Sequence, residues 1–300
     1  MTATLHRDVS FYSGPALKQS GVLDVPGTPL AAPHKARPAV ILCHGPGGNK
    51  EHLVDEVSRV LVEGGYVVLR YDYRGWGASE GPKWRIVPLE QAEDVGNAIT
   101  FLQQQPEVDR NRIGLWGTAT GATLATYVAG VDTRVRCLVA VHAVGDMGRW
   151  MRGMRRYWEW VELLRALEQD RVTRALTGQS RLIKTAEAII GDPSVKEYIA
   201  AVRGPNPPDR FFTLDSLEAM LGFRPDAVVS RISPRAAMWI CALEDVQVPI
   251  EESQRMYELA SEPKRLLLIP GVRHQDLYVG DGLAKMTAAA LEWFNRHLTP

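Results

Sequence analysis

Cysteine is scarce in this chain, and the scarcity excludes a disulfide framework. Three cysteines in 300 residues are too few, and odd in number, for a set of structural bridges. Cys43, Cys137 and Cys241 each lie in an apolar run typical of a buried strand, where a free thiol behaves as a small hydrophobic group. No spacing of cysteine and histidine is typical of a metal site, so we predict no bound metal.

An excess of charge of either sign is also missing. Lys+Arg and Asp+Glu each number 35, which leaves no overall field to attract nucleic acid or an anionic membrane. No apolar run approaches the roughly 18 residues of a transmembrane helix, and the first residues lack the apolar core of a secretion signal. We therefore expect a soluble, cytoplasmic protein that binds neither nucleic acid nor membranes.

Nucleotide-binding signatures are absent as well. Neither the G-x-G-x-x-G fingerprint nor a P-loop occurs, so the sequence implies no cofactor. The composition, 45% hydrophobic and 23% charged, is that of an ordinary globular protein and excludes disordered, collagen-like and coiled-coil classes. The expected partner is a small-molecule substrate.

Short apolar runs alternate with helical patterns along most of the chain, which predicts a mainly parallel sheet. The first two runs, 8–12 and 21–25, lie too close together for an intervening helix, so we expect them to be antiparallel. Later strands are predicted at 39–43, 66–71, 112–117, 135–141, 236–242 and 265–269.

This alternation stops between residues 145 and 225, where the pattern is helical and contains no convincing strand. Trp150, Met154, Trp158 and Val161 recur at helical spacing and define one apolar face. We predict a core formed by residues 1–144 and 226–300, with residues 145–225 forming a helical cap inserted after the sixth strand.

A strand, a sharp turn and a helix meet at Gly117-Thr118-Ala119-Thr120-Gly121. This is the context of a nucleophile elbow, G-x-S-x-G, in which the residues two before and two after the tip must be almost free of side chain. Gly117 and Gly121 satisfy that requirement. The tip itself is Ala119.

With four further motifs, the chain resembles the α/β-hydrolase superfamily. It is most similar to the bacterial branch of serine esterases and dipeptidyl-peptidase-like or dienelactone-hydrolase-like acyl hydrolases. The motifs are His44-Gly45-Pro46-Gly47-Gly48, Asp72-Tyr73-Arg74-Gly75-Trp76-Gly77, Glu244-Asp245 before Val248-Pro249, and Pro270-Gly271-Val272-Arg273-His274. The resemblance implies the α/β-hydrolase fold: a mainly parallel central sheet flanked by helices.

The resemblance also assigns a catalytic triad. It places the nucleophile at position 119, the acid at Asp245 and the base at His274, in the chain order expected for this fold. A serine hydroxyl needs an imidazole to take its proton, and the imidazole needs a carboxylate to hold its tautomer. Glu244 is the alternative candidate for the catalytic acid.

The resemblance further implies an oxyanion hole made by two backbone N–H groups. One belongs to Thr120, directly after the tip of the elbow. The other position falls on Pro46, which has no N–H to donate. Gly47 supplies the second donor if the loop is displaced by one residue.

Alanine at position 119 has no nucleophilic atom, so this chain cannot form an acyl-enzyme. Two explanations remain open. One is a serine-to-alanine substitution made to trap a substrate; the other is a natural protein that keeps the pocket for binding. The retention of Asp245, His274 and both elbow glycines favours the first, because a natural loss would leave them free to change.

We expect the site to be that of a serine-type hydrolase of an ester-like bond in a largely apolar small molecule. Cleavage of a C–C bond in a diketone, cleavage of an amide or carbamate, and non-catalytic binding are the alternatives. Candidate pocket residues are His142, Trp150, Met154 and Trp158. The aromatic stripe of the cap could instead pack on the core or on another subunit, so a homo-oligomer remains possible.

Overall fold

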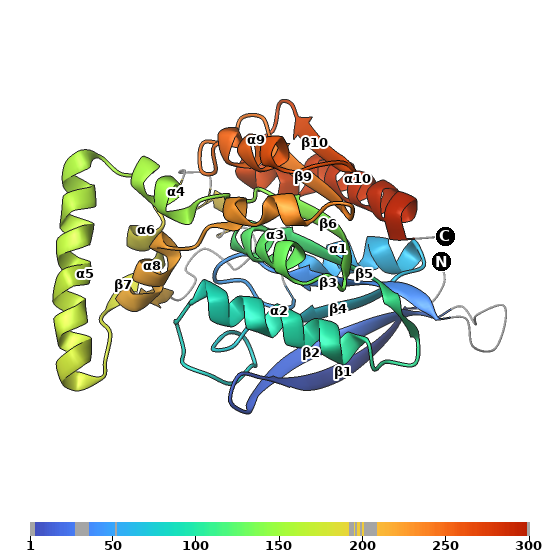
Figure 1. The fold of residues 1–300 in the computed structure, drawn as a ribbon, viewed down its shortest axis with the longest axis horizontal. Coiled ribbons are helices and arrows are strands. Elements are labelled where there is room, and N and C mark those ends of the chain that lie inside the picture. The colour runs from blue at the N-terminus through green and yellow to red at the C-terminus, as the bar shows by residue number, and fades with distance from the viewer. Residues whose placement is uncertain are drawn as a thin grey trace.

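Eight strands form one central sheet in the computed structural model, which describes residues 4–27, 36–51, 53–191, 195, 197, 198, 200 and 209–298 (Figure 1). Their order across the sheet is β1-β2-β4-β3-β5-β6-β9-β10. The strands are β1 Thr4–Ser13, β2 Leu17–Pro26, β3 Arg37–Cys43, β4 Val67–Tyr71, β5 Val108–Thr118, β6 Val135–Val141, β9 Ala236–Ala242 and β10 Lys264–Ile269.

The strand directions follow the sequence pattern. β1 and β2 form an antiparallel hairpin, and β2 also runs antiparallel to β4. The remaining pairs are parallel, with, for example, Leu42 of β3 opposite Trp116 of β5. The predicted antiparallel start and mainly parallel remainder are therefore confirmed.

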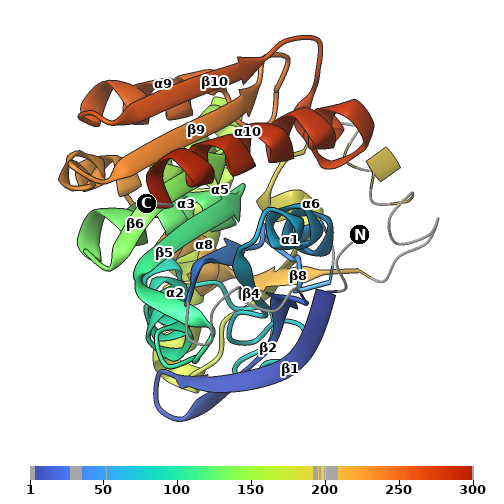
Figure 2. The same cartoon turned by 90° about the vertical axis from the view of Figure 1, so that its right-hand side faces the viewer.

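Helices cover both faces of the sheet, which explains why its strands read as continuous apolar runs. Alternate residues of β3 divide between the faces: Val40 and Leu42 pack toward α1 (Val54–Glu63) and α10 (Gly280–Leu298), which lie on the same side (Figure 2). Ile41 and Cys43 pack toward α2 (Pro88–Leu102) and α3 (Thr120–Val131). α9 (Ile250–Leu259) lies between β9 and β10 in the chain.

Most of the chain between β6 and β9, from α4 to α8, forms a separate group of elements at one side of the molecule (Figure 1). They are α4 Met147–Gly153, α5 Tyr157–Thr177, β7 Leu182–Lys184, α6 Thr185–Ala188, β8 Phe211–Thr213 and α8 Leu214–Leu221. We call this group the insertion; its residues 192–194, 196, 199 and 201–208 lie outside the described part.

Two details of the insertion differ from the sequence prediction. β7 and β8 pair antiparallel, with Ile183 opposite Phe212, where no strand was expected. Strands of three residues are too short to show a hydrophobic period. The expected single helical face over 150–161 is also broken, because α4 is capped at Met154 and α5 begins only at Tyr157.

A buried carboxylate fastens the start of the insertion to the core. Glu252 of α9 accepts hydrogen bonds from the backbone N–H groups of Gly145 and Asp146, at 3.0 and 3.1 Å. Its two oxygens also accept from Arg149 Nε and Nη2, at 2.8 and 2.7 Å. The insertion is thereby held next to the C-terminal end of β6.

Among the described residues, no helix is both long and apolar enough to cross a membrane.

Candidate active site

The turn between β5 and α3 places Ala119 in a strained conformation. Its φ is 50° and its ψ is −121°, values that a residue with a side chain adopts at a cost. The turn is fixed from both sides, since Ala119 N–H donates to Val141 O at 2.9 Å and Ala119 O accepts from Thr123 N–H at 3.0 Å. The geometry is that of an elbow whose tip points away from the strand and the helix.

Both elbow glycines are required by close backbone contacts. A Cβ on Gly121 would overlap the carbonyl oxygens of Cys43 and His44, at the end of β3. A Cβ on Gly117 would lie 2.5 Å from Gly121 O. The start of α3 therefore lies directly against the loop that follows β3.

Asp245 and His274 form a buried pair on the loops that follow β9 and β10. His274 Nδ1 donates to Asp245 Oδ2 at 2.7 Å, and Asp245 Oδ1 accepts from the N–H groups of Gln247 and Val248. Burial alone would raise the pKa of the Asp245 carboxyl, but its contacts with His142 and His274 outweigh burial and hold that pKa well below its usual range. Glu244, the rival acid, is exposed.

The ionised carboxylate fixes the tautomer of His274. With Nδ1–H directed at Asp245, Nε2 is the acceptor atom, as a general base requires. Its partner is the hydroxyl of Tyr278, at 3.1 Å, and that hydroxyl accepts in turn from Thr118 Oγ1 at 2.9 Å. Burial raises the pKa of Tyr278, so the phenol keeps its proton and donates it to Nε2.

Tyr278 is the functional contact that sequence reasoning missed. It lies four residues after His274, on the 3-10 helix His274–Tyr278, and it joins the base to the residue before the elbow tip. The sequence signal that could have indicated this contact is the position of Tyr278 about one helical turn after the base. The hydrogen bond itself depends on the tertiary placement of Thr118.

A second histidine, His142, packs against the Asp245–His274 pair. The His142 ring stacks on that of His274, with centroids 4.1 Å apart and planes at 24°. His142 Nδ1 lies 2.8 Å from Asp245 Oδ2, yet the ring is not aligned for a hydrogen bond. Burial, reinforced by His274, lowers the pKa of His142 to about 4, so it is neutral at pH 7. His142 is buried behind the pair.

His142, Asp245 and His274 are the described residues whose potential metal ligands gather within 4.8 Å. Their nitrogen and oxygen atoms are too close to share an ion. Ligands bound to zinc at about 2.0–2.1 Å in a tetrahedron lie about 3.3 Å apart. The observed separations of 2.7 and 2.8 Å are shorter than that, and the 2.7 Å contact is the His274–Asp245 hydrogen bond.

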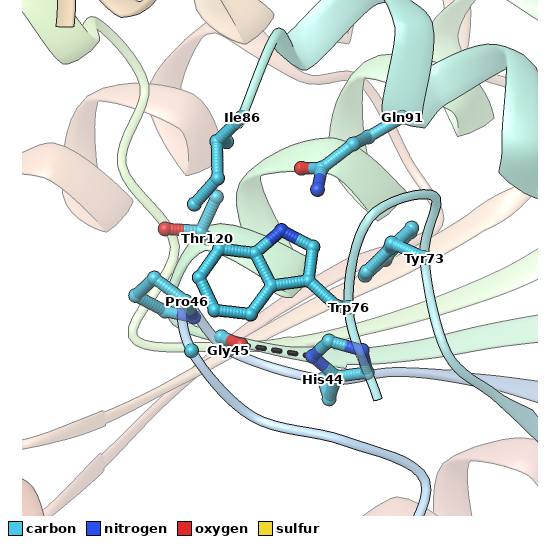
Figure 3. A pocket seen from close by; sticks show the side chains of 9 residues that line it. His44, Gly45, Pro46, Tyr73, Trp76, Ile86, Gln91 and Thr120 are labelled. Carbon is cyan, nitrogen blue, oxygen red and sulfur yellow. Dashed lines mark hydrogen bonds between the residues drawn. The ribbon is translucent and has the colours of Figure 1, made fainter. Parts of the chain in front are cut away.

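The loop after β3 and the start of α3 share a small cavity. Gly45, Pro46, Gly47 and Thr120 line it together with His44, Tyr73, Trp76, Ile86 and Gln91. Figure 3 shows the Trp76 indole between Thr120 and Tyr73. The cavity has a volume of about 10 Å³, which is room for roughly one water molecule. Gly47 and Thr120, the two expected oxyanion donors, thus face one space, and Gly47 has the positive φ of 68° that reverses the loop.

Asp72 holds this loop in place. Its Oδ1 accepts from Lys50 N–H at 2.7 Å, and its Oδ2 accepts from Lys50 Nζ and Ala78 N–H, both at 2.9 Å. The Asp72–Gly77 motif therefore joins the two loops beside the cavity.

The other predicted pocket residues lie away from this cavity. Trp150 is buried, and its Nε1–H donates to Gln247 O at 2.9 Å. Met154 is partly buried against the core. Trp158 is exposed and lines a separate groove of about 340 Å³ within the insertion, together with Leu163 and Ile190.

Comparisons with known proteins identify the family and agree with the fold. The family model described as serine aminopeptidase, S33, matches residues 34–278. The chain is 30% identical to a thiohydrolase of Eupenicillium brefeldianum over 269 residues, 84% of each protein, and 28% identical to an uncharacterized 31.7 kDa protein of Escherichia coli over 87% of this chain and 91% of that one. The crystal structure of the α/β hydrolase GrgF from Penicillium superposes with a TM-score of 0.81 at 25% identity, covering 99% of this chain and all of that one.

The first prediction concerns the elbow contact. Gly121→Ala places a methyl group against backbone atoms that cannot move independently, so we expect a loss of about 3 kcal/mol or more in the free energy of unfolding. The matched control is Gly96→Ala in α2, where a Cβ meets no atom within 4 Å and helix propensity should add about 0.5–1 kcal/mol. Urea denaturation measures both; similar values for the two variants would contradict the close contact.

The second prediction concerns His142. Below its unfolded pKa of about 6.5, the unfolded chain binds a proton that the folded chain takes up only near pH 4, so stability is complete above pH 6.5 and falls toward pH 4. We expect His142 to cost about 2 kcal/mol of stability between pH 7 and pH 5. His142→Phe keeps a ring without a titrating group, so its stability should fall by that much less. Parallel losses in both proteins would refute the assignment.

Proposed function

Because the chain belongs to the serine aminopeptidase S33 family of α/β-hydrolases, we propose that its site binds a small acyl compound with an ester or thioester bond. Family and fold confirm the resemblance read from the motifs. With Ala119 at the elbow, the chain holds such a compound without cleaving it through an acyl-enzyme.

The Asp245–His274 hydrogen bond of 2.7 Å, with the base tautomer it fixes, carries this proposal. A serine at position 119 would give its proton to His274 Nε2 as its oxygen attacked the carbonyl carbon. The N–H groups of Thr120 and Gly47 would stabilise the oxyanion, a contribution of roughly 100–1000-fold in rate for one donor. In this scheme, Ala119 lacks only the nucleophilic oxygen that a serine would supply.

The names of the relatives support an ester or thioester substrate. One is a thiohydrolase, and GrgF carries the name polyketide transferase. A thiolate or alkoxide is a better leaving group than an amine, which must be protonated by the imidazolium before it departs. Amide or carbamate cleavage, and cleavage of a C–C bond in a diketone, use the same residues and are the alternative reactions.

A non-catalytic binding protein is the second candidate, and one observation favours it. The Tyr278 hydroxyl occupies the Nε2 lone pair of His274 that a serine would use. Both candidates agree that this chain forms no acyl-enzyme. They differ in whether the remaining groups are still arranged for catalysis, which the next experiment decides.

The third prediction is that Ala119→Ser produces turnover of p-nitrophenyl acetate and an acyl-N-acetylcysteamine thioester. Since triad members act as a unit, we expect a gain on the order of 10³-fold or more over the parent chain, and a covalent adduct with a fluorophosphonate. Rates and intact-protein mass spectrometry measure these effects.

Matched double variants locate the acid and the base. In the Ala119→Ser background, His274→Ala and Asp245→Asn should abolish most of the gain, whereas Glu244→Gln should leave it nearly unchanged because Glu244 is exposed. Saturable binding of the thioester without adduct or turnover would sink the hydrolase assignment and leave the binding protein. Equal losses for Glu244→Gln and Asp245→Asn would sink the choice of acid.

The fourth prediction addresses Tyr278. In the Ala119→Ser background, the introduced serine and the tyrosine hydroxyl compete for Nε2. Removing a competing hydrogen bond of about 1 kcal/mol with Tyr278→Phe should raise kcat about fivefold while KM changes little. A fall in kcat would show instead that Tyr278 positions the imidazole productively.

A further inference from the structure

Helix α5 has an inner face that packs on the rest of the insertion. Leu163, Leu167 and Asp170 are its buried residues. Arg171 and Arg174 form ion pairs with Glu218 of α8, on the same side. In Figure 1 the helix stands at the edge of the molecule, with the rest of the insertion between it and the sheet. Its other side faces away from the described core.

That other side is mainly apolar, with Arg165 and Glu168 as its charged residues. Tyr157, Trp158, Leu164, Val172 and Leu176 are exposed, with 73% of Tyr157 and 80% of Leu176 accessible to solvent. At 100° per residue, these five and Val161 fall within roughly 120° of arc, opposite Leu163 and Leu167, with Trp158 at the edge of the arc that borders the groove of the insertion. We call these six residues the outer face of α5. Exposed apolar side chains gathered on one helix face in this way often mark an interaction site.

We propose that the outer face of α5 binds the same face of a second copy of this chain, with the two helices antiparallel about a twofold axis near residues 166 and 167. A twofold interface must be self-complementary, because each patch meets its own copy. This proposal does not depend on the function of the active site.

The sequence of α5 meets that requirement residue by residue. In this register Tyr157 lies opposite Leu176 of the second copy, and Val161 lies opposite Val172. Trp158, the largest side chain of the face, lies opposite Ala175, a small one. Large side chains thus meet small or medium ones along the whole helix.

The charged residues of α5 favour antiparallel over parallel packing of the two helices. The antiparallel register places Arg165 against Glu168 of the second copy, and by symmetry it does so twice. Parallel helices would place arginine against arginine and glutamate against glutamate. Within the described part of the chain, the ion pairs of α5 use Arg171 and Arg174, and none uses Arg165 or Glu168. Both charges are therefore available to a second copy.

The size of the helix sets the expected affinity. Its 21 residues span about 31 Å, but one helix face buries less than the roughly 800 Å² per partner of a standard stable interface. Tyr and Trp near the ends are the side chains most often found as anchors of such contacts. We expect a reversible dimer with a Kd in the micromolar range.

Sedimentation equilibrium of the full chain, from about 1 to 200 μM, tests the proposal. Arg165→Glu and Glu168→Arg should each weaken dimerisation at least tenfold, because each opposes like charges at two places. The double variant Arg165→Glu/Glu168→Arg restores opposite charges and should return the Kd to within about threefold of the parent. Lys285→Glu, an exposed reversal on α10, is the control and should change nothing. Circular dichroism melts check that each variant is folded.

Three outcomes would overturn the proposal. The parent chain could remain monomeric over the whole range. The dimer could form equally in both single variants, which would place the interface elsewhere. Both single variants could lose the dimer without rescue in the double variant, which would rule out the antiparallel register.

Discussion

The close approach of α3 to the end of β3 is the contact on which the site depends. It exists because Gly121 has no side chain where the carbonyl oxygens of Cys43 and His44 pass. The contact brings Thr120 to the same cavity as Gly47 and turns the tip of the elbow outward. Asp72, bonded to Lys50 and Ala78, then keeps the neighbouring loop from moving away. Two expected oxyanion donors are thus positioned by backbone contacts, without any contribution from the side chain at position 119.

Burial and hydrogen bonding together set the protonation of Asp245 and His142, on the other side of the site. Burial favours a neutral carboxyl, but two histidines and two backbone N–H groups keep Asp245 ionised. Burial also lowers the pKa of His142 and keeps it neutral, so His142 adds no charge beside Asp245. The Asp245 carboxylate orients His274, and Tyr278 extends the hydrogen-bonded chain to Thr118, beside the elbow. The base therefore has a fixed tautomer without a nucleophile.

Sequence reasoning succeeded where the determining interactions are local. The elbow glycines, the strand pattern and the motifs after β9 and β10 each act within a few residues, and the fold they predicted is confirmed. It failed where the partner is distant in the chain. The pairing of Ile183 with Phe212, the role of Tyr278 and the burial of Trp150 against Gln247 all depend on tertiary placement. Periodicity identified apolar residues of the insertion, but it does not reveal which side of a helix faces inward.

Alanine at the tip is compatible with the elbow conformation for a physical reason. Serine and alanine differ by one oxygen, both carry a Cβ, and both meet the same strain at a φ of 50°. The elbow is held by the bonds from Ala119 N–H to Val141 O and from Thr123 N–H to Ala119 O, which a change of side chain does not break. With no oxygen at position 119, the His274 lone pair accepts from the Tyr278 hydroxyl. The conformation of the elbow and the orientation of His274 therefore depend on backbone and buried hydrogen bonds, and not on the side chain at position 119.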